Sequence, residues 1–266
     1  MPLIQISYRS DFVGRKDIAL IYPAKAPNAL PFFRREESCT RPAKEKYRVL
    51  WLLHGGGDDF TAWPLNAMFL RRCEQQKLLV VMPTIQDFLG YRNELGDFYR
   101  QISEELPEFI GNLFPVSRAR EDNFIAGLSY GGYLAYRIAL DHPDQYSHVG
   151  SFSSPLDCEA DVRTRHEGQS GYPCWEEIPG SALDILSTAK RLTEAGMQLP
   201  RMFQACGTED FTWDFNMTAR EHFRTLGCDH TWFEAPGVHD FDFWNLALAK
   251  YLDWLPLRQE KGRTGV

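Results

Sequence analysis

The stretch that decides the fold is Asn123-Phe124-Ile125-Ala126-Gly127-Leu128-Ser129-Tyr130-Gly131-Gly132-Tyr133. A short apolar run ends here in Gly-x-Ser-x-Gly and passes at once into residues 134–140, whose composition favours a helix. The glycines two positions either side of Ser129 remove Cβ atoms that would clash in a sharp strand-to-helix turn. Ser129 can then hold a strained conformation with its Oγ exposed, which predicts a nucleophile. The alternative is an ordinary turn in which Ser129 caps the helix.

Strand and helix patterns alternate on both sides of this turn. We expect strands at residues 4–8, 17–22, 47–53, 78–82, 123–128, 148–154, 201–205 and 231–235. Helical spacing of apolar residues predicts helices over 61–73, 98–113, 134–140, 183–192, 215–226 and 241–255. Such alternation is typical of an α/β fold, in which helices cover both faces of a mostly parallel central sheet.

The chain has no linker of biased composition and no internal repeat, so we expect one domain over residues 1–266. Residues 155–180 are too long for a simple connection, and long insertions in compact domains are often lids or binding loops. We therefore predict a lid-like insertion there, a surface loop over residues 23–46 and a flexible tail over residues 258–266.

Charge and hydropathy exclude several classes of partner. The formal net charge is −7, and basic and acidic residues interleave without a basic stripe, which argues against nucleic acid. No apolar run approaches the length of a membrane span. The first eight residues alternate like a strand and lack a basic region followed by an apolar segment, so we expect a cytoplasmic protein. A homo-oligomer stays open.

The six cysteines are scattered without a Cys-x-x-Cys pair. In a cytoplasmic chain they are best interpreted as reduced thiols, mostly within the core. A bridge between Cys158 and Cys174 is the alternative, because both fall in one irregular segment.

A serine nucleophile needs a base within hydrogen-bond reach and an acid that orients the base. Such groups should follow later strands in the order Ser, Asp or Glu, His. Asp210 follows the strand at 201–205, and His239 lies in a glycine-containing loop between the last strand and the last helix. We predict these two residues as the acid and the base. Asp157, after the preceding strand, and Glu209 compete for the role of the acid.

The oxyanion of an acyl transfer needs two aimed N–H groups. We expect one from Tyr130, the residue after the nucleophile, and one from Gly56 in the loop that begins at His54. A phosphate-binding loop is the alternative, but this stretch lacks the Gly-Lys-Ser/Thr ending of that motif. A metal site at His239, with Asp240 and Asp242, lacks the spacing of known metal motifs, so we expect no metal and no cofactor.

Several motifs together resemble one family: His54-Gly55, Trp63, Glu104-Glu105-Leu106-Pro107, Arg120-Glu121-Asp122, residues 127–133, Cys206-Gly207-Thr208-Glu209-Asp210 and residues 237–244. They are similar to the tributyrin esterase and esterase D (S-formylglutathione hydrolase) branch of the α/β-hydrolases, from the opening strands to Pro256. The resemblance implies an α/β-hydrolase fold, a triad at Ser129, Asp210 and His239, and oxyanion donors at Gly56 and Tyr130.

The resemblance has two departures. Members usually have Met where this chain has Tyr130, so the phenol could narrow the pocket or bind substrate. The loop Gly55-Gly56-Gly57-Asp58 does not look like that of the glutathione-thioester enzymes. We therefore expect a serine carboxylesterase for short-chain acyl esters of small molecules, acting through an acyl-enzyme. A carbohydrate acetyl or feruloyl esterase, an S-formylglutathione-type thioesterase and a non-catalytic hydrolase-fold binding protein are the alternatives.

Four aromatic residues near the expected site are candidates for the pocket wall, although plain core or lid packing explains them equally well. They are Trp175, Phe211, Trp213 and Trp244.

Overall fold

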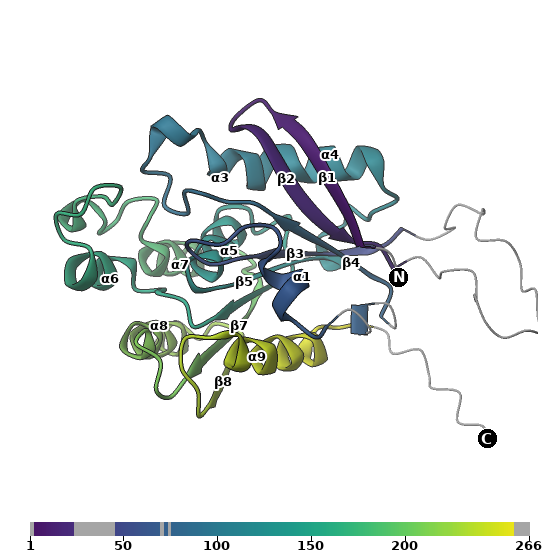
Figure 1. Cartoon of the computed structure of the whole chain (residues 1–266). Coiled ribbons are helices and arrows are strands. Elements are labelled where there is room, and N and C mark those ends of the chain that lie inside the picture. Colours follow the sequence, from purple (N-terminus) through teal and green to yellow (C-terminus); the bar gives the residue numbers. More distant parts are fainter. Residues whose placement is uncertain (1–2, 24–45, 70–71, 74–75, 258–266) are drawn as a thin grey trace, which may run out of the picture.

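The computed structural model describes residues 3–23, 46–69, 72–73 and 76–257 (Figure 1). Within these residues one eight-stranded sheet forms the centre of the molecule. Its strands are β1 (Leu3–Ser10), β2 (Gly14–Ile21), β3 (Arg48–Leu53), β4 (Leu78–Pro83), β5 (Asn123–Leu128), β6 (His148–Phe152), β7 (Arg201–Gly207) and β8 (His230–Ala235).

The spatial order of the strands is β1-β2-β4-β3-β5-β6-β7-β8. Strands β3 to β8 run parallel, and the hairpin of β1 and β2 joins β4 antiparallel. The mostly parallel sheet predicted from the sequence is thus confirmed. Because parallel strands end at the same edge, the loops after β3, β5, β7 and β8 meet there.

Helices cover both faces of the sheet (Figure 1). Trp51 and Leu53 of β3 point into one buried cluster, and Leu50 and Leu52 point into the other, as the alternation of a strand requires. The first cluster contains residues of α3 (Phe98–Arg100), α4 (Leu106–Leu113), α5 (Ser129–Asp141), α6 (Cys158–Arg165), α7 (Ile185–Glu194) and α8 (Trp213–Thr225); the second contains residues of α1 (Ala62–Asn66) and α9 (Phe241–Trp254).

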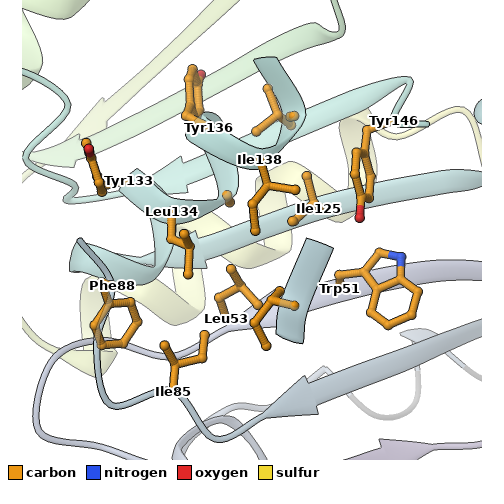
Figure 2. Packing of buried hydrophobic residues seen from close by; sticks show 14 of the residues in the cluster. Trp51, Leu53, Ile85, Phe88, Ile125, Tyr133, Leu134, Tyr136, Ile138 and Tyr146 are labelled. Atoms are coloured by element: carbon orange, nitrogen blue, oxygen red, sulfur yellow. The ribbon is translucent and has the colours of Figure 1, made fainter. Parts of the chain in front are cut away.

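Helix α5 packs on the first face of the sheet, and Figure 2 shows its buried side chains. Leu134 and Ile138 of this helix point toward Leu53 of β3 and Ile125 of β5, and all four side chains are buried. Burying an aliphatic side chain of this size stabilises a fold by about 2 kcal/mol relative to leaving it exposed. This contact holds the residue at the start of α5, Ser129, against the ends of the central strands.

The helix predicted over residues 61–73 is only partly correct. Helix α1 ends at Asn66, and Leu65 and Met68, predicted on its buried face, are 78% and 96% exposed. The side chain of Asn245 in α9 takes over the backbone groups at the break: its amide donates to the Asn66 carbonyl, and its oxygen accepts from the Met68 N–H. A partner from another helix therefore compensates for the lost helical hydrogen bonds.

The helix predicted over residues 98–113 is present, with one irregular turn. Between α3 and α4 lies a π-helical turn, η2 (Gln101–Glu105), in which the Leu106 N–H donates to the Gln101 carbonyl. Pro107 follows directly and has no N–H to continue the regular pattern. Short 3₁₀ turns, η1 (Asn93–Leu95), η3 (Arg120–Asp122) and η4 (Trp175–Glu177), complete the elements.

The insertion at 155–180 has more structure than its irregular sequence indicated, because it contains α6 and η4. The Asp157 carboxylate caps α6 by accepting from the Ala160 N–H. The predicted loop at 23–46, apart from its end residues, and the predicted tail at 258–266 lie outside the described residues. Across the described part of the chain, no helix is both long and apolar enough to cross a bilayer.

Candidate active site

The turn from β5 into α5 has the geometry of a nucleophile elbow. Ser129 has φ of 51°, in the left-handed region that non-glycine residues seldom occupy. A Cβ at Gly127 would lie 2.4 Å from the Gly131 carbonyl carbon, and a Cβ at Gly131 would lie 2.1 Å from the His54 carbonyl oxygen. No side chain fits at those two distances, so both glycines are needed for the turn. Ser129 is left partly exposed at the carboxyl end of β5.

His239 reaches Ser129 from the loop between β8 and α9. Its Nε2 lies 3.0 Å from Ser129 Oγ, and its Nδ1 lies 3.0 Å from each Asp210 carboxylate oxygen. A carboxylate can only accept, so Nδ1–H donates to Asp210. In the neutral ring, Nε2 is then the acceptor for the Ser129 hydroxyl. The structure thus brings together the three residues that the sequence predicted as a triad.

Asp210 is fixed in a buried position at the end of β7. Its side chain is fully buried, and its Oδ1 also accepts from the N–H and the hydroxyl of Thr212. Burial alone would raise the pKa of Asp210, but the hydrogen bond and charge of His239 and the bonds from Thr212 hold that pKa below its ordinary value. Asp210 is therefore ionised, as an orienting acid must be.

The two competing acids have other partners. Asp157 caps α6, and burial raises the pKa of its carboxyl. Glu209 accepts from the Gly237 N–H at 2.6 Å and so joins the loop after β7 to the loop that carries His239. The same two loops touch at Gly207, where a Cβ would lie 2.2 Å from the Gly237 carbonyl oxygen.

The loop after β3 lies against the elbow. A Cβ at Gly55 would be 3.2 Å from Ser129 Cβ, and one at Gly56 would be 3.5 Å from Tyr130 Cδ2. The backbone of this loop therefore approaches the serine closely, as donors to an oxyanion must. Gly56 and Tyr130, the two predicted donors, are neighbours in the structure.

His54 holds this loop in place, a role that the sequence interpretation missed. Its ring is buried and bridges two segments: Nδ1 lies 2.7 Å from the Gly55 carbonyl oxygen, and Nε2 lies 2.9 Å from the Ile85 backbone nitrogen. The carbonyl can only accept and the N–H can only donate, so the ring is neutral with its proton on Nδ1. Burial lowers the pKa of His54 and favours this form. His54 stood out in the sequence as the end of a buried strand and as part of the His54-Gly55 motif, but neither signal indicated this bridging role.

The Tyr130 side chain extends from the elbow to the insertion. Its hydroxyl donates to Asp161 Oδ2 at 2.5 Å, and the Asp161 side chain is fully buried in α6. Burial and the Asp161 charge raise the pKa of Tyr130, so the phenol stays protonated. Asp161 was not predicted, because no apolar period around it indicated a helix that faces the elbow.

Two of the four aromatic candidates adjoin His239. The Phe211 ring lies 4.3 Å from the imidazole, and the Trp244 ring lies 5.0 Å from it, edge to face. Trp213 packs instead against Trp232, and Trp175 lies beneath the Arg163 guanidinium. Phe211 is 53% exposed, whereas Trp244 is buried, so Phe211 is the better placed of the two to meet a substrate.

In the described residues, the side chains named for a metal site or a disulfide make other contacts or remain free. The Asp240 carboxylate caps α9 by accepting from the N–H groups of Asp242 and Phe243. Over residues that the structure describes, no group of three or more His, Cys, Asp or Glu side chains is arranged around a metal position. Cys158 is buried and Cys174 exposed, and both are free thiols.

Comparisons with known proteins agree with this geometry. An acetyl esterase of Caldicellulosiruptor saccharolyticus is 25% identical over 268 residues, which cover 96% of this chain and 98% of the relative. An S-formylglutathione hydrolase of Bos taurus is 32% identical over 128 residues, covering 42% of this chain and 44% of the relative. The fluorophosphonate-binding serine hydrolase F of Staphylococcus aureus superposes with a TM-score of 0.81 at 23% identity, covering 96% of this chain and 98% of that one.

The sheet order, the helices on both faces and these structural neighbours define an α/β-hydrolase fold. The family described as "Putative esterase" matches residues 36–255, and the chain belongs to that family. The protein is a carboxylic ester hydrolase, as the sequence predicted.

Proposed function

We propose that the protein hydrolyses short-chain acyl esters through an acyl-enzyme on Ser129. The observation that carries the proposal is the 3.0 Å contact between His239 Nε2 and Ser129 Oγ, made by a serine held at φ of 51°. A serine hydroxyl is a weak nucleophile near neutral pH, and a neutral imidazole at this distance can accept its proton as it attacks the ester carbonyl.

The remaining steps follow from the same groups. The oxyanion forms between the N–H groups of Gly56 and Tyr130, which the loop and the elbow hold close together. His239 then gives its proton to the leaving alcohol, and Asp210 stabilises the imidazolium that exists in between. A water molecule, deprotonated by His239, hydrolyses the acyl-enzyme and frees Ser129.

Two observations support short acyl groups. The Tyr130 ring stands beside Gly56 and is fixed by its bond to Asp161, so the space next to the oxyanion site is limited. A relative that matches nearly the full length of this chain is named an acetyl esterase.

A second candidate, esters of a carbohydrate, is favoured by a polar cavity. A cavity of about 530 Å³ begins at Gly57 and Asp58, directly after the predicted oxyanion donor. Its lining is rich in groups that bind hydroxyls: Arg15, Lys16, Asp17, Asp59, Thr61, Thr84 and Gln86. A sugar that carries a short acyl group on one hydroxyl would fit such a lining.

The test has two parts. A fluorophosphonate probe should label the wild type and fail to label Ser129→Ala; equal labelling would refute the nucleophile and leave the non-catalytic binding protein in its place. A series of p-nitrophenyl esters from acetate to decanoate, with an acetylated xylo-oligosaccharide, methyl ferulate and S-formylglutathione alongside, should show the highest kcat/KM at the shortest acyl groups. A maximum at octanoate or decanoate would refute the short-chain assignment.

A further inference from the structure

Helix α6 brings a cation to the edge of the candidate active site. The Arg165 guanidinium carbon lies 4.2 Å from the centroid of the Phe211 ring, and that ring lies 4.3 Å from the His239 ring. Arg165 is thus one aromatic ring away from the imidazole. Its side chain is 34% exposed and Phe211 is more so, so both groups are open to a ligand on this side.

Arg165 is held in place, but not all of its hydrogen-bond donors are used. Its Nη1 donates to Asp161 Oδ1 at 2.7 Å, and the other Asp161 oxygen accepts from Tyr130. A guanidinium has five N–H donors in a planar fork. Among the residues that the structure describes, the bond to Asp161 is the one hydrogen bond that its side chain makes. Arg165 therefore keeps free donors in a fixed orientation.

The direction of proton transfer shows which half of the ester faces Arg165. His239 must give its proton to the leaving oxygen, so the alcohol half lies at the imidazole, while the carbonyl oxygen lies at Gly56 and Tyr130. Phe211 and Arg165 lie on the imidazole side. A ligand group about one benzene ring beyond the ester oxygen would meet the guanidinium.

We propose that Arg165 selects esters whose alcohol half carries a carboxylate, separated from the ester oxygen by a spacer of about one aromatic ring. Arginine binds carboxylates through paired, charge-assisted hydrogen bonds, and the exposed part of the Phe211 ring offers the spacer an apolar contact. The proposal rests on the proposed ester hydrolysis at Ser129 and specifies its substrate class.

The test compares two acetate esters, 4-acetoxybenzoate and its methyl ester, which differ in the charge of the group facing Arg165. Arg165→Gln should lower kcat/KM for 4-acetoxybenzoate about tenfold, mainly through KM, and change the methyl ester less than about twofold. Arg165→Lys should recover part of the loss, because it keeps the charge without the planar fork. The ratio of the two substrates within each enzyme cancels any difference in the folded fraction.

Arg163→Gln is the matched control. Arg163 lies on the same helix, but it pairs with Glu159 and covers Trp175, so neither substrate should be affected. A second measurement needs no variant: 4-hydroxybenzoate should inhibit the wild type more strongly than its methyl ester, and this difference should shrink as salt rises.

The outcomes separate the two proposals. Equal losses on both esters in Arg165→Gln would mean that Arg165 only holds α6, and no loss on either would mean that substrate does not reach it; each result overturns the carboxylate proposal while ester hydrolysis stands. Equal inhibition by the two products would overturn it as well. A wild type that hydrolyses neither ester and resists the fluorophosphonate would refute both proposals.

Discussion

At the scale of single residues, the chemistry depends on which acid orients His239. Both carboxylate oxygens of Asp210 lie 3.0 Å from His239 Nδ1. The Asp157 carboxylate instead caps helix α6. Distance, burial and an ionised state all favour Asp210, although the sequence left Asp157 and Glu209 as competitors.

We therefore predict a large difference between two substitutions of the same kind. Asp210→Asn should lower kcat for p-nitrophenyl acetate by on the order of 10⁴, because an amide no longer fixes the imidazole with its proton on Nδ1. Asp157→Asn should stay within a few-fold of the wild type, since Asn caps a helix as well as Asp does. Steady-state kinetics on both variants measure this difference. A larger loss of kcat in Asp157→Asn than in Asp210→Asn would exclude Asp210 as the acid that orients His239.

The residue scale also shows what sequence patterns miss. The proximity of Ser129, Asp210 and His239 could be predicted because each follows a strand in a fixed order. His54 and Asp161 act through contacts between segments that lie 31 positions apart in each case, His54 with Ile85 and Asp161 with Tyr130. Neither contact leaves a local period or motif, so only the folded chain shows them.

At the scale of elements, the elbow is defined by how closely β5, α5 and the loop after β3 approach one another. Gly131 sits where α5 crosses the end of β3, with no room for a side chain. Gly56, in the adjoining loop, has ordinary van der Waals space and a φ that other residues accept.

Two alanine substitutions test this difference. Gly131→Ala should destabilise the fold by about 3 kcal/mol, because its Cβ would overlap the His54 carbonyl oxygen and force the backbone apart. Gly56→Ala should change stability by less than about 0.5 kcal/mol, whatever it does to catalysis. Urea unfolding followed by circular dichroism measures both, and a Gly131→Ala protein as stable as the wild type would contradict the packing.

The elements that the sequence predicted poorly share one physical cause. Helix α1 ends at Asn66, and the side chain that hydrogen-bonds the backbone at this end belongs to Asn245, far along the chain. Helix α6 buries mainly Cys158, Asp161 and Val162, too few apolar residues to give a helical period. The central strands, in contrast, are buried on both faces, and their apolar runs made them predictable.

At the scale of the whole molecule, the buried His148 and the half-buried His230 make stability depend on pH. Burial, together with Arg201 and Arg120, lowers the pKa of His148 to about 4, and burial with Arg220 lowers that of His230 to about 4. In the unfolded chain both would have a pKa of about 6.5. Between these values the unfolded state binds protons that the folded state does not, so stability falls as pH falls.

We predict that the melting temperature drops steadily from pH 7 to pH 4.5, by an amount that His148→Asn and His230→Gln each reduce. The effect is sizeable, because one pKa unit corresponds to about 1.4 kcal/mol for a fully shifted group. Differential scanning fluorimetry across this range is sufficient. A melting temperature unchanged by pH over this window, or an undiminished slope in both variants, would contradict the assignment. Size-exclusion chromatography on the same samples addresses the oligomeric state, which stays a prediction.

The hydrogen bond between Ser129 and His239 joins residues 110 positions apart, and His239 follows the last strand at the edge of the sheet. Contacts this distant in sequence form late, since the entropy of closing a long loop must be overcome first. We therefore expect the elbow to form with β3 and β5 before His239 reaches its serine. Hydrolytic activity would then return only in the final phase of refolding, when β8 and α9 dock. A fluorophosphonate pulse during refolding could therefore time the last step of assembly.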